Sequence, residues 1–171
     1  SDAFGQVIND YQKCREAAKT EGAPSSCSDD NFAEASFYLG LVQWRQGNLE
    51  SALGVLRPLA EDLKLTTVYN TLGVIAVQAS RVEKKNPGKS AALLNEGIDL
   101  LKKASESAPD DANVRFNYAV ALFLTENYTD SATQVRTAIV GNPRDGDAYF
   151  LLAKALEISK DQLAPTVDDQ A

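Results

Sequence analysis

Histidine is missing from all 171 residues of the chain. Its absence removes the imidazole that acts as the base in serine and cysteine hydrolases, and it also removes the commonest metal ligand. The two cysteines, without histidine or further cysteines, do not complete a metal site. The glycines are scattered, and none forms a phosphate-binding loop after a strand. We therefore expect no catalytic residues, no cofactor and no metal.

Methionine is absent too, and long hydrophobic runs are lacking. Because the chain begins with Ser1 and contains no methionine, we expect it to be a mature fragment or a piece of a longer protein. Its apolar runs are only a few residues long, far short of the ~20 residues that span a bilayer. We expect a soluble chain with no direct membrane insertion.

Positive charge is scarce. Lysine and arginine number 17 against 24 aspartates and glutamates, which gives a formal net charge of −7. Such a chain is a poor electrostatic match for nucleic acid or anionic lipid. We therefore expect a protein or peptide partner and no nucleic acid. The length corresponds to about one domain of ~150 residues.

What the sequence does contain is an internal repeat. A large residue followed by a small one recurs along the chain, each time within a helix-periodic apolar stretch: Leu39-Gly40, Leu72-Gly73, Tyr118-Ala119 and Leu152-Ala153. The first and last intervals between these pairs are nearly equal, and the middle interval is longer. A turn and a second amphipathic helix follow the pairs, with a small residue where two helices must approach closely. The pattern predicts a series of helical hairpins.

These pairs and their spacing resemble the tetratricopeptide repeat family, whose pattern of ~34 residues is W-x2-L-G-x2-Y, A-x3-F and P. The resemblance covers about Phe32 to Ile158, although alanine replaces glycine at Ala119 and Ala153. It implies an all-α solenoid of helical hairpins with a right-handed superhelix. We expect about three repeats, an N-terminal half-repeat helix and a C-terminal closing helix.

The expected boundaries divide a single helical-repeat domain into seven parts. They are an N-terminal helix (1–19), a loop (20–30), repeat 1 (31–65), repeat 2 with an extended hairpin (66–111), repeat 3 (112–145), a closing helix (146–162) and a tail (163–171). In the first part, Phe4, Val7, Tyr11 and Cys14 have the spacing of the second helix of a repeat. We expect that helix either to continue an array upstream or to cap the stack.

The resemblance also implies a binding groove along the first helices of the repeats. We expect apolar, aromatic and amide side chains to line it: Phe37, Tyr38, Trp44, Asn70, Val74, Phe116, Asn117, Val120 and Phe123. An asparagine can pair with both the N–H and the C=O of a bound backbone, and Asn117 lies where peptide-binding members often carry one. Some of these residues are alternatively ordinary core, and the N-terminal helix or the tail could itself fill the groove.

Two further features lie outside the groove. The extra residues of repeat 2 predict a protruding hairpin, whose tip concentrates Arg81, Lys84, Lys85 and Lys89 against Glu83; it is either a docking site or a solvated helix end. Cys14 and Cys27 lie close together in the sequence and form either a disulfide or two free thiols. A disulfide would favour an extracytoplasmic, periplasmic bacterial setting over the cytoplasm.

The sequence thus favours a noncatalytic interaction module that holds a peptide or helix of a partner in its groove. The alternative is a structural spacer or self-association domain of a larger, cell-envelope protein, in which the chain would form a homo-oligomer.

Overall fold

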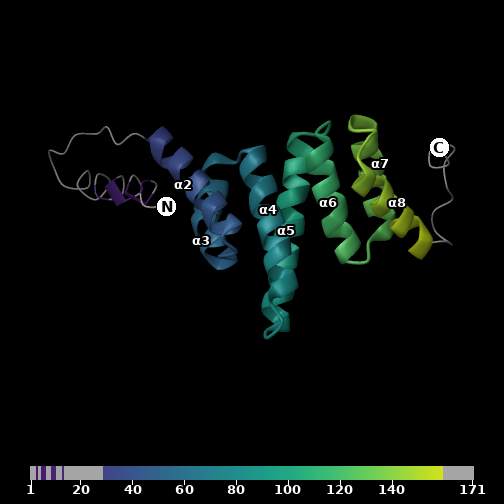
Figure 1. The fold of residues 1–171 in the computed structure, drawn as a ribbon, viewed down its shortest axis with the longest axis horizontal. Helices are drawn as coiled ribbons and strands as arrows, with labels where there is room; N and C mark the ends of the chain where they lie inside the picture. The colour runs from purple at the N-terminus through teal and green to yellow at the C-terminus, as the bar shows by residue number, and fades with distance from the viewer. Residues whose placement is uncertain (1–2, 4, 7–8, 11–12, 14–28, 160–171) are drawn as a thin grey trace. The chain divides into compact units, whose positions relative to one another are not determined.

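The computed structural model describes residues 3, 5–6, 9–10, 13 and 29–159. The chain divides into two compact units, Ser1–Val68 and Tyr69–Ala171, and each is described here by itself. The predicted disulfide between Cys14 and Cys27, most of the predicted N-terminal helix and the predicted tail lie outside the described residues. Within the described ranges all regular secondary structure is helical, as predicted (Figure 1).

The first unit contains one helical hairpin, made of α2 (Asp29–Arg45) and α3 (Leu49–Leu63). Gly47 lies in the turn with a φ of +80°, a conformation that favours glycine. The two helices approach so closely at Gly40 that a Cβ atom there would lie 2.5 Å from Leu56 Cγ. Leu56 is fully buried, so the repeated glycine serves helix packing here.

The second unit contains the remaining helices. They are most of α4 (Thr66–Val82), α5 (Pro87–Ser107), α6 (Ala112–Leu124), α7 (Tyr128–Gly141) and α8 (Gly146–Ile158). Aspartates cap the first helices of successive repeats: Asp111 accepts the backbone N–H groups of Asn113 and Val114, and Asp145 accepts those of Asp147 and Ala148. Consecutive helices pack as antiparallel hairpins, which confirms the predicted helical-hairpin architecture (Figure 1).

The extra residues of repeat 2 lengthen both of its helices. α4 has 17 residues and α5 has 21, whereas α6 and α7 have 13 and 14. The α4–α5 hairpin accordingly extends beyond α6 and α7, with its turn at the far end (Figure 1).

Small residues let the helices of the second unit pack closely. A Cβ at Gly97 would lie 2.6 Å from Val77 Cγ2 and 2.9 Å from the carbonyl oxygen of Gly73, so α4 and α5 nearly touch through their backbones. In the next hairpin, the buried Ser131 Oγ donates a hydrogen bond to the carbonyl oxygen of Ala119, 2.8 Å away. Leucine and valine fill the space beside these contacts, as Leu101 and Val135 do.

Candidate functional site

The predicted groove residues of the first unit all lie on α2. Phe37 and Trp44 are half-buried, and Tyr38 is 44% exposed. The rings of Phe37 and Tyr38 meet edge to face, with centroids 6.1 Å apart. These aromatic side chains give the first unit a partly exposed apolar surface.

In the second unit, two predicted groove residues pair with each other. Asn117 on α6 donates through Nδ2 to Oδ1 of Asn70 on α4, at 3.0 Å, and both side chains are half-buried. The pair joins the first helices of two successive repeats across 47 residues of sequence. The bond uses one donor of Asn117 and the side-chain carbonyl of Asn70, so it does not use the side-chain N–H groups of Asn70 or the side-chain carbonyl of Asn117.

Two valines flank this pair along the same helices. Val74 lies one turn after Asn70, and Val120 lies three positions after Asn117; both are half-buried. Val74 packs against a cluster of buried residues that includes Val77 and Leu101. We call Asn70, Val74, Asn117 and Val120 the amide face.

The two predicted aromatic residues of α6 contact the protein core. Phe116 and Phe123 are partly buried against the cluster formed by Ala119, Val135 and other residues of α6, α7 and α8. The Phe123 ring also meets the Tyr128 ring of α7, with centroids 5.2 Å apart. These contacts match the expectation that some of the listed side chains are ordinary core.

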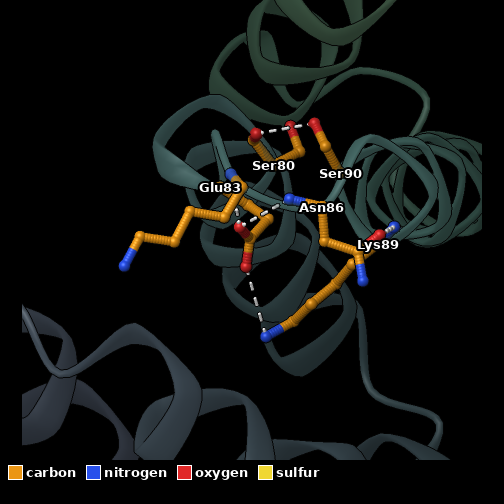
Figure 2. A network of polar contacts seen from close by, with 6 residues as sticks. Ser80, Glu83, Asn86, Lys89 and Ser90 are labelled. Atoms are coloured by element: carbon orange, nitrogen blue, oxygen red, sulfur yellow. Dashed lines mark hydrogen bonds and ion pairs between the residues drawn. The ribbon is translucent and has the colours of Figure 1, made fainter.

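The basic tip of the α4–α5 hairpin is built around one acid. The Glu83 carboxylate accepts the backbone N–H groups of Lys85 and Asn86, at 3.0 and 3.2 Å, and pairs with Lys89 Nζ at 3.5 Å (Figure 2). Asn86 caps α5 by accepting the N–H of Lys89. Arg81, Lys84 and Lys85 are exposed beside this network, so Glu83 balances one of the four predicted cations and leaves a basic tip.

We expect this turn to loosen in acid. The hydrogen bond from the backbone N–H of Lys85 holds the pKa of Glu83 below its ordinary value of 4.5. Desolvation raises this pKa, and the backbone N–H of Asn86 and the charge of Lys89 lower it further. Because the pKa of Glu83 is lower in the folded state than in the unfolded state, its carboxylate stabilises the turn fully when the pH is above the unfolded-state pKa. This stabilisation is lost as the pH falls through the folded-state pKa. Amide exchange protection of Lys85 and Asn86 should fall between about pH 6 and about pH 3.

The Lys89 amide is the internal control for that experiment, since its acceptor is the neutral Asn86 side chain. The variant Glu83→Gln should show low protection of the Lys85 and Asn86 amides at both pH values. Equal protection of the wild-type amides across the range would contradict the role of Glu83.

One further titratable group is perturbed in the second unit. Burial raises the pKa of the Tyr118 hydroxyl, and the carboxylates of Asp130, Glu106 and Asp99 raise it further. Tyr118 packs against the cluster that contains Leu101, and this packing accounts for the burial that raises its pKa. The described residues contain no group of side chains that could hold a metal ion and no helix apolar and long enough to cross a membrane.

The last helix, α8, is the predicted closing helix, and it exposes an apolar face that the list of predicted groove residues did not include. Tyr149 is 44% exposed and Phe150 is 66% exposed, and Ala153, one turn after Tyr149, is also exposed. The repeat period gives the place of this face, because Tyr149 and Ala153 occupy the positions that Arg115 and Ala119 hold in α6.

Antiparallel helix pairs that recur along the chain, packed through small residues, define a helical-repeat protein of the class that mediates protein interactions. A family model described as the tetratricopeptide repeat matches residues 28–61 and 90–139. The family model and the fold support assignment of these residues to the tetratricopeptide repeat family. No curated protein matches the sequence at a significant level.

Solved structures of MamA share the fold. One described as the crystal structure of MamA has a TM-score of 0.67 and 18% identity, and covers 92% of this chain and 79% of its own. MamA from Desulfovibrio magneticus RS-1 has a TM-score of 0.65 and 13% identity, with 94% and 88% covered. MamA MSR-1 has a TM-score of 0.63 and 20% identity, with 91% and 84% covered. At these identities the likeness shows the fold alone.

Proposed function

We propose that the chain is a noncatalytic module that binds an extended peptide segment of a partner protein along the amide face. The family generally consists of noncatalytic interaction modules, which supports the general class. The observation that carries the specific proposal is the half-buried pair of Asn70 and Asn117. Their hydrogen bond leaves N–H donors on the Asn70 amide and a carbonyl acceptor on the Asn117 amide.

This arrangement is complementary to a peptide backbone. An extended chain alternates C=O and N–H groups, which would accept from Asn70 and donate to Asn117. The half-buried valines beside the pair offer apolar surface to the side chains of the same peptide. The existing bond between the two amides holds both in place before the peptide arrives, which reduces the entropy lost on binding.

The proposal is tested by selecting peptides that bind the full chain. Random 12-residue peptides displayed on phage are enriched on the chain, synthesised with a fluorescent label and titrated by anisotropy. We expect Asn117→Ala to weaken the enriched peptides by about tenfold, equal to about 1.4 kcal/mol, because one backbone hydrogen bond and the amide pair are lost.

The matched control is Asn95→Ala, which removes an exposed asparagine from α5. It should leave the affinity unchanged. Circular dichroism of both variants checks that helicity is retained. Equal affinity of the wild type and Asn117→Ala for every enriched peptide would refute the amide face as the binding site.

A further inference from the structure

The exposed face of α8 corresponds to a face that is covered elsewhere in the same unit. On α6, Ala119 is fully buried, and its carbonyl oxygen accepts a hydrogen bond from Ser131 of α7. One turn earlier, Arg115 Nη1 donates to Gln134 Oε1 of α7 at 2.6 Å. These two positions of α6 therefore receive the second helix of the hairpin.

The same positions recur on α8, one repeat later, and are open. Tyr149 replaces Arg115 and is 44% exposed, and Ala153 replaces Ala119 and is exposed. Tyr149 and Ala153 lie one turn apart on one face of α8, and Phe150, which is 66% exposed, adjoins that face. An exposed apolar face of this kind marks a contact surface. The occupant that fits is a helix with the side-chain pattern of α7.

The residues that follow α8 do not carry this pattern. In α7 the contacting positions are Ser131, which is small, and Val135, which is large and apolar; both are fully buried. The corresponding positions in the next repeat period are Pro165 and Asp169. A proline inside a helix and a carboxylate at a buried apolar position are both unfavourable.

The N-terminal segment of the chain does carry the side-chain pattern of α7. Its residues Phe4, Val7, Tyr11 and Cys14 are separated by three, four and three positions. The residues that form the inner face of two second helices have the same separations: Leu94, Gly97, Leu101 and Ala104 in α5, and Tyr128, Ser131, Val135 and Ala138 in α7. The segment thus has the spacing of a second helix, with Val7 at the position of the small residue.

We propose that the N-terminal segment of a second copy of this chain packs as a helix on the exposed face of α8. The contact completes a hairpin between two chains. Because it joins two different surfaces, the contact is heterologous, and a dimer keeps one unused surface of each kind, one on each copy. Copies therefore assemble head to tail, and the assembly grows beyond a dimer. The net charge of −7 opposes this, so added salt strengthens the assembly by screening repulsion.

The test measures the mass of the full chain by light scattering after size exclusion, over a range of concentrations. The wild type should grow past the mass of a dimer as concentration rises. Ala153→Arg places a charge on the α8 face at a position already exposed, so the variant folds and should remain a monomer. Tyr11→Glu should also remain a monomer, because it places a charge in the pattern of the N-terminal segment.

Mixing the two variants gives the decisive result. Each retains one of the two complementary surfaces, so an equimolar mixture should form a dimer and grow no further. Thr137→Arg, on an exposed position of α7, is the control and should assemble like the wild type. A wild type that is monomeric throughout, an Ala153→Arg variant that still assembles, or a mixture that stays monomeric would each overturn the proposal. This test is independent of peptide binding by the amide face.

Discussion

Gly97→Ala is expected to lower the free energy of unfolding of the second unit by about 2 kcal/mol. The added Cβ would lie 2.6 Å from Val77 Cγ2 on α4, and 2.9 Å from the carbonyl oxygen of Gly73. The second contact is with backbone, so a change of side-chain rotamer cannot relieve it. α4 and α5 must move apart, and the buried side chains between them lose contacts. This cost exceeds the gain in helix propensity, which is about 1 kcal/mol for glycine to alanine.

Gly146→Ala is the matched control for that substitution. Gly146 begins α8, and a Cβ there meets no atom within 4 Å. The control should therefore be neutral or slightly stabilising. Urea unfolding followed by circular dichroism measures both variants, and Trp44, the single tryptophan, reports separately on the first unit. A Gly97→Ala variant as stable as Gly146→Ala would contradict the close packing of α4 against α5.

Leu101→Ala should cost about 3 kcal/mol of unfolding free energy. Leu101 is 1% exposed and packs in one cluster with Val77 and Ala121, so its side chain bridges three helices of the second unit. Truncation removes buried apolar atoms and leaves a cavity that rigid helices fill poorly. The control is Val140→Ala, since Val140 is 81% exposed on α7 and its truncation should change stability by less than about 0.5 kcal/mol. The same urea titration measures both variants.

A double variant sharpens this test. A Cβ at Gly73 would lie 2.7 Å from Leu101 Cγ, so Gly73→Ala alone should be destabilising. The double variant with Gly73→Ala and Leu101→Ala should lose less stability than the sum of the two single losses. The alanine side chain at position 73 then occupies part of the cavity that the truncation of Leu101 leaves. Strictly additive losses would show that the two residues are not in contact.

The hairpin architecture could be predicted from the sequence because its cause is local and repeated. Each hairpin needs a small residue where its two helices make close contact. The spacing of Leu39-Gly40, Leu72-Gly73 and the equivalent pairs shows where these small residues recur in the sequence. The capping aspartates, Asp111 and Asp145, repeat at the same period because each begins a first helix. The long α4–α5 hairpin follows from the one interval that breaks the period.

The candidate site was harder to predict because it depends on which side chains meet across helices. The sequence placed Asn70 and Asn117 on one expected surface, but periodicity says nothing of a bond between two amides so far apart in the chain. It likewise did not distinguish Phe123, which packs against Tyr128, from side chains that remain open to a ligand. The ion pair of Glu83 with Lys89 depends on the fold of a turn, which the charge count alone does not fix.

The most direct test of the binding site is a nuclear magnetic resonance titration of the isotope-labelled full chain with a peptide enriched by phage display. It follows the side-chain amide signals of Asn70 and Asn117 and the methyl signals of Val74 and Val120. We predict that these signals shift on binding and that the backbone signals of Lys84 and Lys85 at the basic tip do not. Shifts confined to the basic tip, with the amide face unchanged, would contradict the account.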